Sequence, residues 1–370
     1  MAAPIRVLIV DDSSLARAML RSIFEDDGGF QVVAEAGNGR DAVIQAQRLR
    51  PDLITMDLEM PVMGGLDAIE EIMGVKAVPI LVVSSVADAQ KAYTAVARGA
   101  IEVVSKPGVS ASDIADFVDK ARLVASIPVI THVRIRRVSP DTADAPRSPQ
   151  SLTPQSLTPQ SLAPQSSAPV TAAGASGAER VVAIAASTGG PQALAHILGR
   201  LSPGFASPIV IAQHIADGFA PGLVDWLASI TRLPVRLGRA GESLTPGVVY
   251  LSPSEHNMTV SKFRRIDLSP RQPGQVYRPS CDALLTSVAQ ACGRQAMGLI
   301  LTGMGSDGVS GMEAIRAAGG MTLAQDEASS VIFGMNAIAI EKGWVQRVLP
   351  LDALADLLAG LPRLPVGGVP

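Results

Sequence analysis

The chain has 370 residues, a formal net charge of -3 and a hydrophobic content of 47%. This length exceeds what a single core usually supports, so we expect two domains and a connection between them. The charge excludes a strongly basic nucleic-acid-binding protein, and no apolar run reaches the roughly 20 residues that a membrane-spanning helix needs.

Two further features concern the compartment. The start of the chain, MAAPIRVLIVDDS, is unlike a secretory signal because two aspartates follow the apolar run that ends at Val10. The two cysteines, Cys281 and Cys292, are too few for a disulfide framework or a metal cluster. We expect both to be small buried hydrophobic side chains, in a monomeric cytoplasmic protein without membrane insertion or a nucleic-acid partner.

The first 125 residues alternate short β-branched runs with helical patterns. Such runs are typical of buried parallel strands. Five strands and five helices in one repeating order predict an α/β domain with a doubly wound, five-stranded parallel sheet. The expected strands are Ile5–Val10, Val32–Ala36, Leu53–Met56, Ile80–Val83 and Ile101–Val104, and the expected helices follow Ser13 and lie near Asp41–Leu49, Leu66–Met73, Ala87–Ala97 and Ser112–Val124.

Polar side chains follow four of these strands. Asp11 and Asp12 follow the first strand, Asp57 the third, Ser84 the fourth and Lys106 the fifth. Carboxylates that share one sheet edge repel each other unless a cation lies among them, and oxygen ligands suit Mg²⁺. A lysine and a hydroxyl nearby would suit a phosphoryl group. Solvated loop ends would explain one or two of these residues but not the whole set.

The motifs VDDS, DLITMDLEMPVMGGLDAI, VVSS and GAIEVVSKP resemble the receiver domain of two-component response regulators, over residues 4–124. The resemblance implies a flavodoxin-like fold in which Asp57 accepts phosphate from a histidine kinase. It implies that Asp11 and Asp12 help Asp57 to hold Mg²⁺, and that Ser84 and Lys106 respond to the phosphoryl group.

The sequence departs from the receiver pattern at two positions. Gly64 stands where many receivers carry aspartate, and Val103 stands where many carry an aromatic residue. The second departure puts the aromatic-swing signalling of many receivers in doubt for this chain, but it leaves phosphorylation itself in place.

The middle of the chain contains a repeat, SPQSLTPQSLTPQSLAPQSSAP, with proline at every fifth residue. Proline lacks a backbone donor and favours extended chain, and serine and glutamine bury too little apolar area to offset chain ordering. We therefore predict a largely disordered, semi-extended tether over residues 126–178.

A second alternation of strands and helices begins at Glu179. It predicts another α/β domain with a mostly parallel sheet flanked by helices. Helices are expected after Pro191, Pro221, Pro279 and Gly311, because proline favours helix starts. The expected strands are Val181–Ala185, Pro208–Ala212, Val248–Leu251 and Gly298–Leu301, with weaker ones at Met258–Val260, Met321–Ala324 and Val345–Val348.

Ser187, His214 and Asp307 lie in loops after three of these strands. A histidine can take the proton of a serine hydroxyl, and a carboxylate can orient that histidine. Ser187 stands in A-x-S-x-G, a loosened nucleophile elbow. Ser187 could equally cap the next helix, or the two glycines that follow it could bind a phosphate at the start of that helix.

Spacing alone does not select this triad. His256, in a polar loop, is the strongest rival to His214, whereas His196 fits a helix surface and His132 the edge of the tether. The Asp-Gly pair at Asp307 is also an ordinary turn sequence. The competing aspartates are Asp217, Asp225, Asp267, Asp282 and Asp326.

The segments AASTGGPQAL, IAQHIADGFAPGLVDWL, VYLSPSEHNM and LILTGMGSDGVSGM resemble the catalytic domain of chemotaxis protein-glutamate methylesterases, the CheB family, over about residues 179–365. The resemblance implies that Ser187 is the nucleophile, His214 the general base and Asp307 its orienting partner. It also implies an oxyanion hole formed by backbone N–H groups near Thr188 and Met304.

These inferences predict a receiver domain at 1–125, a linker at 126–178 and a methylesterase domain at 179–370. We expect a phosphorylation-activated serine hydrolase that demethylates glutamate methyl esters on chemotaxis receptors and deamidates their glutamines, with no cofactor in the hydrolase site. We expect the glycines after Ser187 to leave room for a receptor side chain. The alternative is a response regulator with a non-catalytic C-terminal binding domain.

Overall fold

The computed structural model describes residues 3–129, 180–272 and 274–361. Nearly all of the predicted tether at 126–178 lies outside these residues. Two α/β domains lie within them.

The N-terminal domain contains the predicted five-stranded sheet, in the order β2-β1-β3-β4-β5, with parallel pairing throughout. Because the strands run in one direction, their carboxyl ends meet at one edge. The strands are β1 (Ile5–Val10), β2 (Phe30–Ala36), β3 (Leu53–Met56), β4 (Ile80–Ser84) and β5 (Glu102–Ser105).

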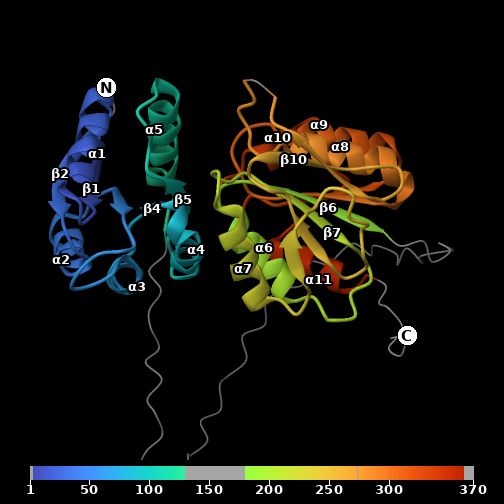
Figure 1. The fold of residues 1–370 in the computed structure, drawn as a ribbon, viewed down its shortest axis with the longest axis horizontal. Coiled ribbons are helices and arrows are strands. Elements are labelled where there is room, and N and C mark those ends of the chain that lie inside the picture. Colours follow the sequence, from blue (N-terminus) through green and yellow to red (C-terminus); the bar gives the residue numbers. More distant parts are fainter. Residues whose placement is uncertain (1–2, 130–179, 273, 362–370) are drawn as a thin grey trace, which may run out of the picture. The chain divides into compact units, whose positions relative to one another are not determined.

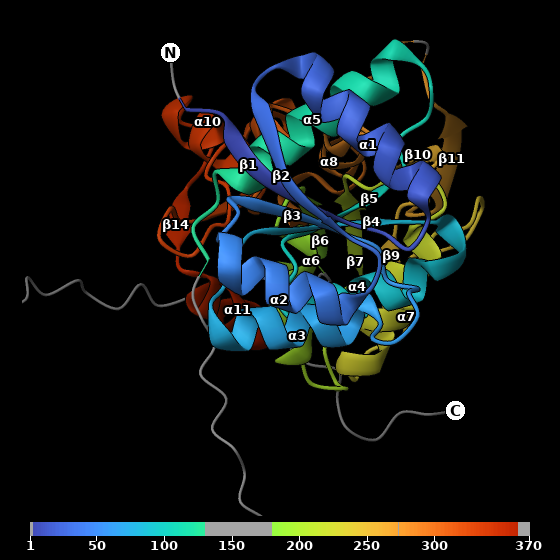
Figure 2. The same cartoon turned by 90° about the vertical axis from the view of Figure 1, so that its left-hand side faces the viewer.

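Helices cover both faces of this sheet, as Figure 2 shows, with α1 and α5 on one side and α2, α3 and α4 on the other. Side chains alternate between the faces of a strand. Ile9 accordingly packs with Phe24 of α1, whereas Leu8 packs with the helices of the opposite layer. The helices are α1 (Ser14–Asp27), α2 (Gly39–Leu49), α3 (Gly65–Val75), α4 (Ala89–Ala97) and α5 (Ala111–Ala125).

The C-terminal domain contains a seven-stranded sheet, in the order β14-β13-β12-β6-β7-β9-β8. Every pairing in it is parallel. The chain runs outward from β6 through β7 on one side and returns to β12 on the other, so β6 lies at the point where the strand order reverses. The strands are β6 (Val181–Ala186), β7 (Ile209–Gln213), β8 (Val235–Leu237), β9 (Val249–Leu251), β12 (Ala296–Ile300), β13 (Met321–Gln325) and β14 (Arg347–Leu349).

Helices cover both faces of this second sheet, with α8, α9 and α10 on one side and α6, α7 and α11 on the other (Figure 1). Ala183 and Ala185 of β6 pack under the first set, and Val182 and Ile184 under the second. The helices are α6 (Gly190–Gly199), α7 (Ala220–Ile230), α8 (Cys281–Cys292), α9 (Val309–Ala317), α10 (Met335–Glu341) and α11 (Leu351–Ala359).

The structure confirms the predicted strands, with ends that shift by up to two residues, and it corrects two details. The predicted strand at Met258–Val260 lies in a separate antiparallel hairpin of β10 (His256–Val260) and β11 (Ile266–Pro270). Ser187 does not cap the next helix, because Gly189, with a left-handed φ of 78°, occupies that position. None of the described helices is both long and apolar enough to cross a membrane.

Candidate active site and phosphoacceptor site

Ser187 and His214 follow directly paired residues of neighbouring strands. Ala186 ends β6, Gln213 ends β7, and these two residues are paired across the sheet. Asp307 lies between β12, the other neighbour of β6, and α9. The parallel sheet thus brings three loops to the edge where its strands reverse order, which is where open α/β sheets bind ligands.

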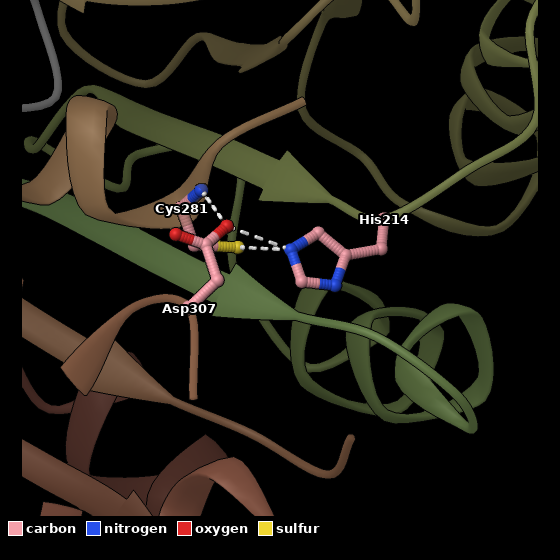
Figure 3. Close-up of side chains that lie close together, drawn as sticks. All are labelled: His214, Cys281 and Asp307. Carbon is pink, nitrogen blue, oxygen red and sulfur yellow. Dashed lines mark hydrogen bonds and ion pairs between the residues drawn. The ribbon is translucent and has the colours of Figure 1, made fainter. Parts of the chain in front are cut away.

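His214 and Asp307 contact each other directly, with 2.8 Å between His214 Nε2 and Asp307 Oδ2 (Figure 3). An ionised carboxylate only accepts hydrogen bonds, so Nε2 carries the proton in this contact. The other ring nitrogen, Nδ1, is then the acceptor. A histidine in this tautomer can take a proton from a hydroxyl through Nδ1.

The start of helix α8 holds the Asp307 carboxylate. Oδ2 accepts the Cys281 N–H at 2.6 Å, and Oδ1 accepts the Asp282 N–H at 2.9 Å and the Ser280 hydroxyl at 3.1 Å. Burial acts to raise the pKa of Asp307, but the His214 contact and these backbone donors outweigh it and lower the pKa. Asp307 therefore stays ionised and keeps one orientation.

Helix α9 receives a reciprocal cap from α8. Asp282 Oδ1 accepts the N–H groups of Gly308 and Gly311, at 2.9 and 2.8 Å, at the start of α9. Asp307, just before α9, meanwhile caps α8. Each helix start therefore binds a carboxylate from the other segment, which fixes the loop that carries Asp307.

Cys281 lies beside the His214–Asp307 pair, with its Sγ 3.4 Å from His214 Nε2 (Figure 3). Ligand atoms of these three residues lie within 4.8 Å of one another. Burial and the Asp307 charge raise the pKa of the Cys281 thiol well above its usual value, and the thiol donates to the Ala212 carbonyl. Cys281 is thus a neutral packing group, as the sequence predicts, rather than a thiolate ligand.

The loop after β6 holds Ser187 through its backbone. Ser187 N–H donates to the Thr302 carbonyl at 3.1 Å, and its carbonyl accepts the Gly190 N–H at 2.7 Å. Among the described residues, no hydrogen bond joins Ser187 Oγ to His214. Contacts between a nucleophile and its base often tighten only when substrate binds.

The two expected oxyanion donors are available. Among the described residues, no hydrogen-bond acceptor binds the N–H groups of Thr188 and Met304. The Thr188 carbonyl is fixed by the Thr302 hydroxyl at 3.0 Å. The loop of Met304 is anchored through Gly303, whose N–H donates to the Ile332 carbonyl at 3.0 Å.

Sequence reasoning missed two side chains of this site. Tyr277 stacks on His214, with 5.1 Å between the ring centroids and 17° between the planes. Gln213 donates to the carbonyls of both Ser187 and His214. No signal in the sequence marks Tyr277, whereas Gln213 could have been noticed as a polar residue that ends a buried strand.

The rivals His256, His196 and Asp217 lie elsewhere, whereas Asp282 lies beside Asp307 and caps α9. His256 is exposed at the start of β10, and His196 bonds to Asp352 on the surface of the domain. Asp217 forms an ion pair with Arg271. Among the four histidines, His132 lies outside the described residues.

The polar residues of the N-terminal sheet also meet at one edge. The Lys106 ammonium lies 2.7 Å from Asp11 Oδ2 and 3.0 Å from Asp57 Oδ2. Carboxylate oxygens of Asp11, Asp12 and Asp57 lie within 4.8 Å of one another. The buried Ser84 hydroxyl has no hydrogen-bond partner among the described residues.

This edge fits a cation and an anionic group. Burial raises the pKa of Asp57; Lys106 opposes this, the Asp11 charge adds to it, and the net shift is upward. Three carboxylates share this edge with the Lys106 ammonium, and their oxygen ligands suit a divalent metal ion. The free hydroxyl of Ser84 is available to an oxygen of a further group.

Comparison with protein-family models assigns both domains. Residues 7–119 match the response regulator receiver domain, and residues 182–358 match the CheB methylesterase domain. The fold and the two sites thus define a class: a response regulator with a methylesterase output domain.

Similar proteins share the whole architecture. Protein-glutamate methylesterase/protein-glutamine glutaminase 3 of Paramagnetospirillum magneticum is 62% identical over 368 residues, covering 99% of this chain and 98% of that protein. A counterpart from Anaeromyxobacter dehalogenans is 40% identical, covering 97% and 98%. The Thermotoga maritima CheB methylesterase catalytic domain has 32% identity and a TM-score of 0.48, and covers 50% of this chain and all of that one. The chain belongs to the CheB methylesterase family.

Proposed function

We propose that this chain hydrolyses glutamate methyl esters on chemotaxis receptors, with Ser187 as nucleophile, His214 as general base and Asp307 as the residue that orients the base. One observation carries the proposal: the His214–Asp307 contact of 2.8 Å lies at the ends of the two strands that flank the Ser187 strand.

In this mechanism, Ser187 Oγ attacks the ester carbonyl while His214 Nδ1 takes the hydroxyl proton. The Thr188 and Met304 N–H groups donate to the oxyanion that develops, and such donors are worth about 3 kcal/mol each. His214 returns the proton to the leaving methoxy group, and methanol departs. Water then attacks the acyl-enzyme by the same steps in reverse, which releases glutamate and restores Ser187.

The same residues can deamidate glutamine. The amide carbonyl passes through the same kind of tetrahedral intermediate, and His214 delivers the proton to the leaving nitrogen, so that ammonia replaces methanol as the first product. Asp307 keeps the imidazole in the required tautomer in both reactions.

The N-terminal domain would act as the switch. Asp57 would accept the phosphoryl group of a histidine kinase, and Asp11, Asp12 and Asp57 would hold Mg²⁺. When bound, the ion would offset the negative charge of the phosphoryl oxygens. Lys106 and the free hydroxyl of Ser84 would bind those oxygens.

In the unphosphorylated protein the receiver would inhibit the methylesterase domain, and phosphorylation would release it. The long tether permits this, since each doubling of a flexible loop costs only about 0.6 kcal/mol, and it sets the local concentration of the two domains. We place the protein in the cytoplasm as a monomer.

Methanol release from methylated receptor membranes tests the proposal. Wild type should release methanol faster with a phosphodonor, Asp57→Asn should lose this increase, and Ser187→Ala should be inactive with its fold intact. Retained activity in Ser187→Ala would refute the nucleophile assignment. Deletion of residues 1–124 should raise activity, and no change would refute inhibition by the receiver.

A further inference from the structure

Gln213 connects the two loops that carry the nucleophile and the base. It is the last residue of β7 and is only 2% exposed. Its Nε2 donates to the Ser187 carbonyl at 2.8 Å and to the His214 carbonyl at 2.9 Å. One amide group therefore uses both of its N–H donors on the backbones of two proposed catalytic residues.

The chemistry of this contact requires an amide. The Ser187 and His214 carbonyls each accept a hydrogen bond from the same nitrogen atom. Only an NH₂ group at the end of this side chain supplies two such donors. A glutamate of the same shape would place an anion against both carbonyls. The assignment of Nε2 and Oε1 follows from these contacts.

The other end of the amide is unsatisfied. Gln213 Oε1 is buried and has no hydrogen-bond partner among the described residues. A buried acceptor without a partner lowers stability. A side chain selected only for stability would not leave this atom unpaired, so the two donated bonds need another explanation.

Gly190 makes room for this amide. A Cβ on Gly190 would overlap Gln213 Oε1 and would lie 2.8 Å from the Ala186 Cβ. Gly189 is enclosed in the same way, because a Cβ there would lie 2.5 Å from the Val331 Cβ. The two glycines thus accommodate the protein's own side chains, which corrects the expectation that they leave room for a receptor side chain.

We propose that Gln213 is a positioning residue for the hydrolysis: it sets the distance between the Ser187 and His214 loops, and it does so at a cost in stability. A second bond joins the end of β6 to this loop, from the His214 N–H to the Ala186 carbonyl at 2.9 Å. That bond fixes the strand ends, whereas the Gln213 amide fixes the carbonyls of both catalytic residues. The inference rests on the proposed triad.

The test compares Gln213→Met, which keeps the length and removes both donors, with Gln213→Glu, which keeps the shape and adds an anion. The matched control is Gln346→Met, because Gln346 also bonds a backbone group with its side chain, the Thr322 N–H at 2.9 Å, but on β13. The readouts are kcat, KM, the pH profile of kcat/KM and the melting temperature, on the full chain. Ser187→Ala is assayed in parallel.

We expect kcat of Gln213→Met to fall about 100-fold, since a displacement of about 1 Å in a catalytic group has this effect. KM should stay within about threefold, because substrate contacts are unchanged. The melting temperature should change by at most about 3 °C, since the unpaired Oε1 is removed as well. Gln213→Glu should be about tenfold slower still and should partly recover as the pH falls, and Gln346→Met should retain wild-type kcat.

Three results would overturn the proposal. They are a folded Gln213→Met whose kcat lies within about threefold of wild type, a loss of kcat that only follows the loss of folded protein, and a Gln213→Met that cannot fold. If Ser187→Ala stays active, the triad itself is wrong. If Ser187→Ala is inactive while Gln213→Met is fully active, only the role of Gln213 is wrong.

Discussion

The two sites of this protein lie at equivalent places, the carboxyl ends of parallel strands, yet their carboxylates differ. Asp307 accepts hydrogen bonds from four donors, and its pKa is lowered. Asp57 is buried beside Asp11 with one shared ammonium, and its pKa is raised. Asp307 thus accepts four hydrogen bonds, whereas Asp57 accepts two, from the Leu58 N–H and the Lys106 ammonium.

The difference matches what each site is proposed to do. A group that orients a base must keep one charge and one position throughout the reaction, so fixed donors around it favour catalysis. A residue that accepts a phosphoryl group must change its charge, and the unpaired Ser84 hydroxyl can donate to the added oxygens. We therefore expect the charges of Asp307 and Asp57 to contribute to stability at neutral pH with opposite signs.

Asp307→Asn should have the largest effect. The amide can donate to His214 Nε2 and thereby stabilise the tautomer with the proton on Nδ1, which cannot act as the base. We expect a fall in kcat of about 10⁴-fold, measured as methanol release. Asp217→Asn, which changes a surface aspartate paired with Arg271, is the control. A fall of less than about tenfold would contradict the orienting role.

Asp282→Ala should have a smaller effect, on stability and activity together. It removes the acceptor of the Gly308 and Gly311 N–H groups, and loss of a helix cap costs about 1–2 kcal/mol in the free energy of unfolding. Asp282→Asn should be much milder, because both N–H groups bond to Oδ1 alone. Urea unfolding of the full chain measures the free energy of unfolding of both variants. Equal losses in Asp282→Ala and Asp282→Asn would show that the charge of Asp282 matters and not its capping bonds.

Asp57→Asn should have the smallest effect and the opposite sign. Burial raises the pKa of Asp57 above its unfolded value of about 3.9. The contribution of Asp57 to stability is therefore fully present below that value and is lost as the pH rises through the folded-state pKa. At pH 7, with EDTA present, Asp57→Asn should therefore raise the melting temperature of the receiver domain, and the gain should vanish below about pH 3.9.

The control for this measurement is Asp67→Asn, since Asp67 is an exposed aspartate paired with Arg98. It should give no comparable rise. A lower melting temperature in Asp57→Asn at pH 7 would show that the ion pair with Lys106 outweighs burial and would remove the contrast with Asp307. For Asp307 the sign is reversed, since its contribution is present above about pH 3.9 and is lost as the pH falls through its lowered pKa.

Much of the fold and many of the site residues could be predicted from local pattern. Buried strands such as Ile5–Val10 and Val181–Ala186 are continuous apolar runs, and a strand's end is where the run stops. The short edge strand Val235–Leu237 was missed because it is half exposed and bounded by proline and glycine. This segment forms a strand because it pairs with β9, and its own sequence does not indicate a strand.

The sequence by itself determined which residues could carry chemistry, because residue type and position after a strand are local properties. Only the tertiary structure decided which of them meet. It placed β12 and β7 on either side of β6, so that Asp307 reaches His214 while His256 lies apart. It also placed the Gln213 amide against Gly190, where a side chain would overlap it. Strand order and the enclosure of a glycine depend on contacts between distant segments, and no local pattern encodes such contacts.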